Sequence, residues 1–212
     1  MIRVMLADDH SIVRTGLKQV LSEASEFTVC AEAATGDEVL AAVRQSPPDV
    51  LVLDMSMPGR SGIELIRLLK GEFPRLGILV LSMHNEEQYA IRAIKAGAAG
   101  YLTKDNASEQ LIGALRKVAS GGVFISPAVA ERLALEFGSR HEQLPHTKLS
   151  DREFQIFQMI VAGDTITAIS ERLSLSVKTV STHKSRILQK MDLGSTAELI
   201  RYAVDHQLLL PR

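Results

Sequence analysis

Five short apolar runs divide the first 120 residues, and each is followed by a longer stretch with the apolar spacing of an amphipathic helix. The runs cover residues 2–7, 27–31, 50–53, 78–81 and 99–102. Three of them are rich in Val, Ile and Leu without polar alternation, which is typical of parallel strands covered on both faces. Repeated strand–helix units are joined by right-handed crossovers. This part of the chain therefore predicts an α/β domain, a doubly wound five-stranded parallel sheet.

The pattern changes at Gly121-Gly122. We interpret residues 121–147 as a linker with one helix, near residues 127–137, because Gly, Pro and Ser punctuate this stretch. Residues 148–212 show only helical spacing, in four segments. Ser150 and Glu153 form the S-x-x-E pattern of a capping box at the start of the first of them. The second domain is therefore predicted to be all-α, with four helices.

Composition limits the kinds of protein that this chain can be. Of its 212 residues, 46% are hydrophobic and 23% are charged, as in an ordinary folded chain, and the net charge of −1 points to no partner. Cys30 is the one cysteine, so no intramolecular disulfide is possible, and its apolar neighbours predict a buried, inert thiol. No stretch approaches the roughly 18 uncharged apolar residues of a membrane span. Asp8 and Asp9 interrupt the first apolar run before it could act as a signal peptide. We therefore expect a cytoplasmic protein without a membrane partner.

Acidic residues follow two of the predicted strands. In a flavodoxin-like sheet of order 2-1-3-4-5, ligands bind where the strand order reverses, beyond the carboxyl ends of strands 1 and 3. Asp8 and Asp9 follow the first strand and Asp54 follows the third. Three converging carboxylates repel one another unless a cation neutralises them, and Mg²⁺ suits a few carboxylates completed by waters. The sequence therefore predicts a Mg²⁺ site.

Ser82 and Lys104 follow the fourth and fifth strands. A hydroxyl and a cation beside a metal suit the binding and transfer of a phosphoryl group. Asp54 is then the natural nucleophile, because the metal would occupy Asp8 and Asp9. Each residue alone is more often a turn former, a helix cap or a solvated lysine, and only the combination favours a site. A dinucleotide site is disfavoured because the first turn lacks G-x-G-x-x-G.

One ordered set of residues runs through the first domain, namely Asp8-Asp9-His10, the segment 54–59, Ser82, the segment 97–101 and Lys104. This set resembles the receiver domain of bacterial two-component response regulators, over about residues 1–120. The resemblance implies that Asp54 accepts a phosphoryl group from a sensor histidine kinase.

The same resemblance assigns the metal and the switch. It implies that Mg²⁺ is held by Asp9, Asp54 and the backbone carbonyl of Ser56, with Asp8 acting through water. Lys104 would contact the phosphoryl oxygens. Ser82 and Tyr101 would be the switch pair, with the hydroxyl moving toward the phosphoryl group and the ring turning inward.

A basic helix stands out in the second domain. Residues 166–173, a turn near Ser176 and residues 177–190 predict a helix-turn-helix. Helical spacing places Val180, Ile187 and Met191 on a core face of the long helix. Small hydroxyls and cations lie largely outside that face, at Lys178, Ser181, Thr182, Ser185 and Arg186. Such a surface can approach phosphates and base edges in a major groove. The alternative is a solvated amphipathic helix, which cations without an acidic partner at i+4 make less attractive.

The segments 149–153, 175–183 and 190–191 closely resemble the LuxR-type DNA-binding domain, over about residues 148–208. With the receiver, the chain resembles the NarL/FixJ class of response regulators. The resemblance implies that Lys178, Thr179 and His183 lie near the DNA backbone. It also implies that base edges are faced by Ser181, Thr182 and Ser185, assisted by Lys184 and Arg186. The last helix would supply a dimer surface through Ala197, Leu199, Ile200 and Val204, with some of these serving the core of the domain instead.

These expectations describe a DNA-binding regulator that is a phosphoacceptor protein and not an enzyme. Phosphorylation would favour a homodimer that binds promoter DNA at inverted half-sites and acts on RNA polymerase. A regulator that binds DNA independently of phosphorylation is the alternative. A Mg²⁺-dependent aspartyl-phosphate phosphatase would use similar carboxylates, but the strand-to-helix loops are too short for a substrate-capping insertion.

Overall fold

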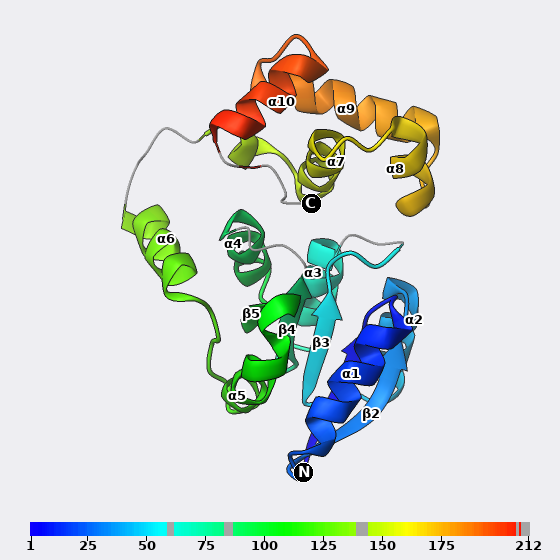
Figure 1. The fold of residues 1–212 in the computed structure, drawn as a ribbon, viewed down its shortest axis with the longest axis vertical. Coiled ribbons are helices and arrows are strands. Elements are labelled where there is room, and N and C mark those ends of the chain that lie inside the picture. Colours follow the sequence, from blue (N-terminus) through cyan, green and yellow to red (C-terminus); the bar gives the residue numbers. More distant parts are fainter. Residues whose placement is uncertain (59–61, 83–86, 139–143, 207, 209–212) are drawn as a thin grey trace. The chain divides into compact units, whose positions relative to one another are not determined.

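The computed structural model describes residues 1–58, 62–82, 87–138, 144–206 and 208, and the text below concerns these residues. The chain forms two compact units, Met1–Gly138 and Ser139–Arg212, and each is considered by itself (Figure 1). No helix in the described part of the chain combines the length and the hydropathy that crossing a bilayer requires.

The first unit alternates strands and helices as the sequence predicts. Its strands are β1 (Ile2–Ala7), β2 (Phe27–Ala33), β3 (Val50–Asp54), β4 (Gly77–Ser82) and β5 (Gly100–Thr103). Its helices are α1 (Ser11–Ser22), α2 (Gly36–Gln45), α3 (Gly62–Glu72), α4 (Glu87–Lys95), α5 (Ala107–Ala119) and α6 (Pro127–Gly138), with a 3₁₀ turn, η1, over Lys104–Asn106. All strand pairs are parallel and the order is β2-β1-β3-β4-β5, so the predicted sheet is confirmed.

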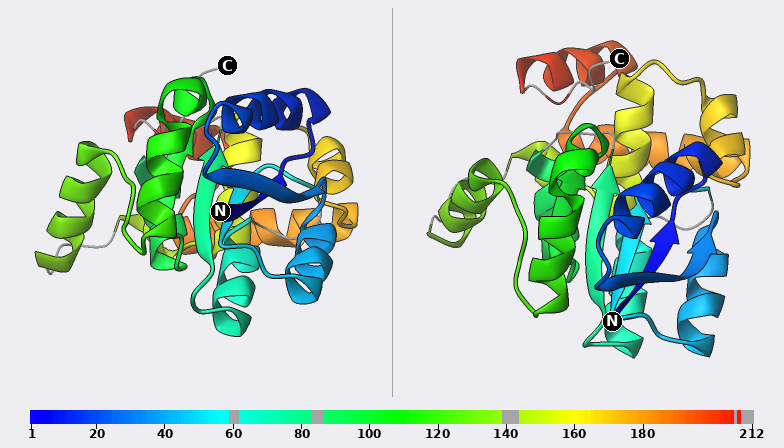
Figure 2. Two further views of the ribbon diagram at one scale, coloured as in Figure 1. Left: turned by 90° about the horizontal axis from the view of Figure 1, so that it is seen from below. Right: turned by 60° about the horizontal axis from the view of Figure 1, so that its bottom comes forward.

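Helices cover both faces of this sheet (Figure 2). Along β3, Leu51 and Leu53 join the core formed with α2, α3 and α4. Val50 and Val52 join the core formed with α1 and α5 on the opposite face. Because successive side chains point to opposite faces, a strand covered on both sides needs an apolar residue at every position. This double burial explains the unbroken apolar runs in the sequence.

The edge strand β2 departs from the prediction at Cys30. The register of β1 and β2 slips between Val4, which pairs with Val29, and Met5, which pairs with Ala31. Cys30 is the extra residue of this bulge, its Sγ lies 3.5 Å from the carbonyl oxygen of Val4, and it is exposed. A bulged residue on an edge strand is not held against a neighbouring strand. The prediction of a buried core thiol was therefore wrong.

The chain returns to the sheet after α5. Residues 123–125, called the edge segment below, lie beside β5, and Phe124 forms a parallel bridge with Gly100. The amide of Tyr101 donates to the carbonyl of Phe124, and the amide of Phe124 donates to the carbonyl of Ala99, both at 2.9 Å. Helix α6 then packs against α4, with Val129 buried in the same core. The helix expected within the linker therefore belongs to the compact body of the first unit.

The second unit contains the four predicted helices. They are α7 (Asp151–Val161), α8 (Ile166–Arg172), α9 (Val177–Met191) and α10 (Thr196–Asp205), preceded by the 3₁₀ turn η2 (Pro145–Lys148). The capping box of Ser150 and Glu153 is formed at the start of α7. Glu153 also forms an ion pair with Lys190 of α9, with 2.6 Å between Lys190 Nζ and Glu153 Oε2. This pair links the first helix of the unit to the end of the third. The core that the four helices form includes Phe154, Phe157, Ile187 and Leu199, all fully buried.

Candidate functional site

Three carboxylates meet at the carboxyl edge of the sheet. β1 pairs with β3, with Ala7 opposite Leu53, so Asp8 and Asp54 emerge side by side. Both are 1% exposed, whereas a third of the side chain of Asp9 is exposed. Two buried carboxylates in contact with a third are costly unless positive charge compensates them. We refer to Asp8, Asp9 and Asp54 as the acidic cluster.

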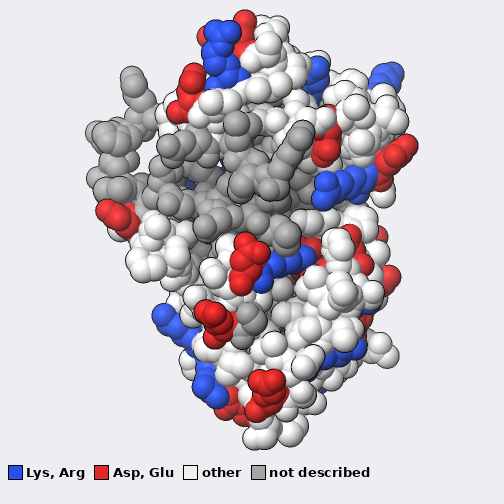
Figure 3. Space-filling model, in the orientation of Figure 1, with Lys and Arg blue, Asp and Glu red and all other residues white. Residues whose placement is uncertain are grey.

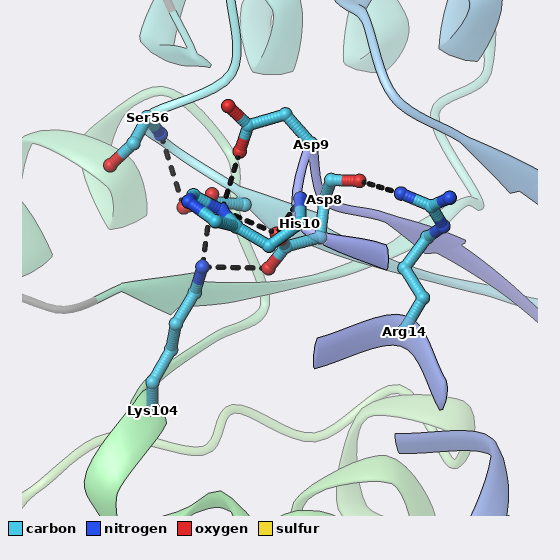
Figure 4. A network of polar contacts seen from close by, with 7 residues as sticks. Asp8, Asp9, His10, Arg14, Ser56 and Lys104 are labelled. Carbon is cyan, nitrogen blue, oxygen red and sulfur yellow. Dashed lines mark hydrogen bonds and ion pairs between the residues drawn. The ribbon is translucent and has the colours of Figure 1, made fainter. Parts of the chain in front are cut away.

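Lys104 supplies part of that compensation. Its Nζ lies 2.6 Å from Oδ2 of Asp8 and 3.0 Å from Oδ2 of Asp54, so it bridges the two buried carboxylates (Figure 4). Burial raises the pKa of Asp54 and the charge of Asp8 raises it further, against the opposing effects of Lys104 and the Ser56 amide. Burial lowers the pKa of Lys104, but the charges and hydrogen bonds of Asp54 and Asp8 more than offset this, so its pKa is raised. Lys104 therefore stays charged while Asp54 remains only partly compensated.

The turn after β1 is fixed by backbone contacts. Asp8 Oδ1 accepts a hydrogen bond from the His10 amide at 2.8 Å, and Arg14 donates to the carbonyl of Asp8 at 2.6 Å. The Nδ1 atom of His10 lies 2.9 Å from Asp9 Oδ1 and 3.2 Å from Asp8 Oδ1. Sequence reasoning assigned no role to His10 or Arg14. The signal available for them was their position, directly after the two aspartates and one helical turn later.

This arrangement fits a divalent cation. One ligand atom from each of Asp8, Asp9, His10 and Asp54 can be chosen so that all four lie within 4.8 Å of one another. Carboxylate oxygens are the ligands that hard cations prefer, and Lys104 contacts two of the three carboxylates, Asp8 and Asp54. The cluster is of the acidic type on which receiver domains hold Mg²⁺.

The remaining residues predicted for this site lie on the two neighbouring strands. Ser82 ends β4 and is fully buried, and Lys104 follows β5. Tyr101 lies within β5, 8% exposed, opposite Val80 and two positions before the residue that pairs with Ser82. The Ser56 amide donates to Asp54 Oδ1 at 3.1 Å. Ser82 and Lys104 thus lie at the same edge of the sheet as the acidic cluster, whereas Tyr101 lies inside β5, and Gly59 of the same motif lies outside the described residues.

The exposed face of α9 carries the predicted DNA-binding residues. Val180, Ile187 and Met191 are buried, as predicted. Five residues are exposed, namely Lys178, Ser181, Thr182, Ser185 and Arg186, and three are half-buried, namely Thr179, His183 and Lys184. Val177, at the first position of the helix, is 49% exposed although it is apolar. On the side seen in Figure 3, acidic and basic side chains are interspersed, in agreement with the net charge of −1.

Helix α10 exposes an apolar stripe. Ala197, Ile200 and Val204 are exposed, and they follow the spacing of one helix face. Leu199 is fully buried in the second unit, so it is one of the residues of this helix that serve the core of the domain.

Comparison with known protein families covers both units. Residues 4–116 match the response regulator receiver domain, and residues 147–203 match the bacterial regulatory proteins of the luxR family. The chain belongs to the two-component response regulators. Within them it falls in the NarL/FixJ class, which joins a receiver to a LuxR-type DNA-binding domain. A response regulator is a phosphoacceptor protein, which sets aside the phosphatase alternative.

Similar proteins span nearly the whole chain. Response regulator GacA of Pseudomonas viridiflava is 38% identical over 210 residues, covering 99% of this chain and 98% of the relative. Oxygen regulatory protein NreC of Staphylococcus carnosus is 39% identical over 214 residues, covering 98% and 99%. A structure of the Salmonella typhimurium response regulator RcsB has a TM-score of 0.71 at 28% identity, covering 96% of this chain and 97% of RcsB. Another, of RcsB bound to a promoter with a phosphomimetic, has a TM-score of 0.67 at 27% identity, covering 95% and 97%.

Proposed function

We propose that Asp54 is the phosphoacceptor of this response regulator and that a sensor histidine kinase is the donor. The observation that carries this is the placement of a buried carboxylate with a raised pKa between Lys104 and the remaining acidic cluster. In the transfer, an Asp54 carboxylate oxygen forms a bond to phosphorus while the bond from phosphorus to the donor breaks. Lys104 is positioned to contact the phosphoryl oxygens and to keep the emerging acyl phosphate in place.

Mg²⁺ is the cation that we propose for the acidic cluster. Asp8, Asp9, Asp54 and the backbone carbonyl of Ser56 would hold it, and when bound it supplies the positive charge that lets an anionic donor approach three carboxylates. The hydroxyl of Ser82, at the end of β4, would move toward the phosphoryl group and donate to one of its oxygens. The ring of Tyr101 in β5 would then turn inward. The backbone bond from Tyr101 to Phe124 supports this role, because it joins the switch residue to the edge segment that leads into α6.

We further propose that residues 148–212 bind promoter DNA as a dimer. The exposed hydroxyls and cations of α9 suit phosphates and base edges, in the roles assigned by the sequence, and Val177 adds an apolar group beside them. Support comes from a structure of two RcsB dimers bound to DNA. The RcsB chain in that structure is 27% identical to this chain and has a TM-score of 0.59. Ala197, Ile200 and Val204 would form the dimer contact, inverted half-sites would match its symmetry, and RNA polymerase would be the target. A cytoplasmic location would give such a protein access to the kinase and to DNA.

The first experiment is intact mass measurement after incubation with acetyl phosphate and Mg²⁺, with Asp54→Ala alongside. We expect a single phosphoryl adduct on the wild-type chain and none on the variant. DNA affinity and dimerisation are then compared between the two forms. An adduct that persists in Asp54→Ala would contradict the assignment of Asp54. The absence of any adduct would favour a regulator that binds DNA independently of phosphorylation.

A further inference from the structure

Val177 places an apolar side chain at the exposed start of α9. It is the first residue of the helix and is 49% exposed. The core face of the helix is formed by other residues, Val180, Ile187 and Met191, which are buried. In a helix-turn-helix, the N-terminal residues of the second helix contact base edges in the major groove. Val177 therefore lies at a position that contacts base pairs, and its side chain can form no hydrogen bond with them.

Two hydroxyl groups on the same exposed face are already bonded within the helix. Thr182 Oγ1 donates to the carbonyl of Lys178 at 2.9 Å. Ser185 Oγ donates to the carbonyl of Ser181 at 3.1 Å. A hydroxyl bonded in this way has used its one proton, so toward a base it can only accept. The other heavy atom on the Cβ of Thr182, an exposed residue, is a methyl carbon, which adds a second apolar group to this face.

The residue types at 177–186 restrict which base pairs can be recognised by paired hydrogen bonds. Lys and Arg, which contact guanine, occur at positions 178, 184 and 186. Asn and Gln, which pair with adenine, are absent from this stretch. An A·T pair is therefore left to single hydroxyls and to the apolar groups. The feature of an A·T pair that an apolar group can contact in the major groove is the C5 methyl of thymine.

We propose that Val177 and the methyl group of Thr182 contact thymine methyl groups, and that this regulator selects its half-site through them. The inference rests on the proposed function, since it concerns the DNA bound by α9. Apolar contact removes both methyl groups from water, and adenine, guanine and cytosine carry no methyl group at the equivalent place. Lys178, exposed beside Val177, would bind phosphates of any sequence and so hold the helix in the groove.

The alternative is that the hydroxyls of α9 recognise A·T pairs through single hydrogen bonds, while Val177 only lies near the DNA. Deoxyuridine separates the two cases. It lacks the C5 methyl of thymine but keeps the O4 acceptor and the pairing with adenine. Replacing one thymine by deoxyuridine therefore removes the apolar contact and leaves the hydrogen bonds in place.

The probe is a duplex enriched from a random library by the full chain after incubation with acetyl phosphate and Mg²⁺. The duplex is resynthesised with deoxyuridine at one thymine position at a time, and its Kd is measured by fluorescence anisotropy. For wild type we expect roughly fourfold weaker binding at the contacted thymines, the effect of one buried methyl group. Val177→Ala and Thr182→Ser should each abolish this difference at one position, and the serine keeps the hydroxyl. Lys178→Ala, the matched control on the same helix, should weaken binding to both duplexes equally.

Equal affinity for thymine and deoxyuridine at every position would overturn the inference, as would a half-site without thymine. A deoxyuridine effect that persists unchanged in both Val177→Ala and Thr182→Ser would also overturn it. In each of these outcomes the chain still binds DNA, so the proposed function stands. If no duplex is enriched, the proposed DNA binding fails and the inference fails with it. All three substituted residues are exposed, and circular dichroism of each variant verifies that the helices are retained.

Discussion

Replacing Lys104 by Met tests the electrostatic account of the acidic cluster. Methionine keeps the length of the side chain and removes its charge, so two buried carboxylates lose a partner at 2.6 and 3.0 Å. At an effective dielectric constant of about 20, each of these attractions is worth about 6 kcal/mol, from which the cost of burying the ammonium must be subtracted. Breaking a buried ion pair costs about 3–5 kcal/mol in general.

The loss of stability in Lys104→Met has an upper limit, because one of the two carboxyls can take up a proton and so become neutral. Taking a carboxyl of ordinary pKa, about 3.9, to its neutral form at pH 7 costs about 4 kcal/mol. Asp54 already has a pKa raised by burial, and it would take up the proton in the variant. We therefore expect the free energy of unfolding of the first unit to fall by about 2–4 kcal/mol at pH 7.

The loss should depend on pH with a defined sign. Above the ordinary pKa of the carboxyl, the folded variant holds a proton that the unfolded chain has released. Its stability therefore falls as pH rises, by up to about 1.4 kcal/mol per pH unit, until pH passes the raised pKa. The deficit relative to wild type should accordingly grow as pH rises above the ordinary pKa of a carboxyl toward the raised pKa of Asp54.

Hydrogen exchange of the full chain in metal-free buffer measures this. Peptides from β3 and β4 report the first unit, peptides from α7 and α9 serve as an internal reference, and Lys117→Met controls for removal of an exposed lysine. Mg²⁺ should restore part of the lost protection if a cation can replace the charge of Lys104. An unchanged stability, or a loss of equal size at every pH, would refute the reasoning.

Four further substitutions test the edge segment of the first unit and the stability and dimer contact of the second unit. In Gly100→Ala, the new Cβ would lie 3.1 Å from the carbonyl oxygen of Phe124, so we expect the phosphoryl adduct to form but dimerisation on phosphorylation, measured by sedimentation, to weaken. Ser176→Ala removes the N-cap of α9 and should cost about 1 kcal/mol, seen as faster hydrogen exchange at the start of that helix. Leu199→Ala should cost about 2–5 kcal/mol in thermal unfolding of the second unit, whereas the exposed Val204→Ser should stay within about 0.5 kcal/mol and weaken the dimer.

The sheet and its functional edge could be predicted because two local signals agree with the fold. Strands buried on both faces need apolar residues at every position, and β3 and β4 show this directly in the sequence. Once the strand order is that of a doubly wound sheet, Asp8 and Asp54 have to emerge beside each other. Neither step needs knowledge of side-chain packing.

Other features depend on contacts that the local pattern does not contain. The bulge at Cys30 is a property of the pairing between β1 and β2, and the sequence of β2 alone reads as regular. Helix α10 has apolar residues on two faces, and periodicity could not decide whether Leu199 or Val204 faces the core. The position of the His10 ring beside Asp9 is another such feature, because the turn that brings it there is stabilised by the Asp8 side chain and by Arg14.

The edge segment connects β5, which leads to Lys104 of the candidate site, directly to the start of α6. Phe124 is bound to the strand by backbone hydrogen bonds to both neighbours of Gly100, so it follows β5 whatever side chain it carries. A glycine at position 100 is needed for that approach, because a Cβ there would meet both Leu79 and Phe124. Phe124 lies three residues before α6, which packs against α4 in the same unit. A displacement of β5 at Tyr101 would therefore reach the edge segment directly and, through it, the start of α6, the last helix of the first unit.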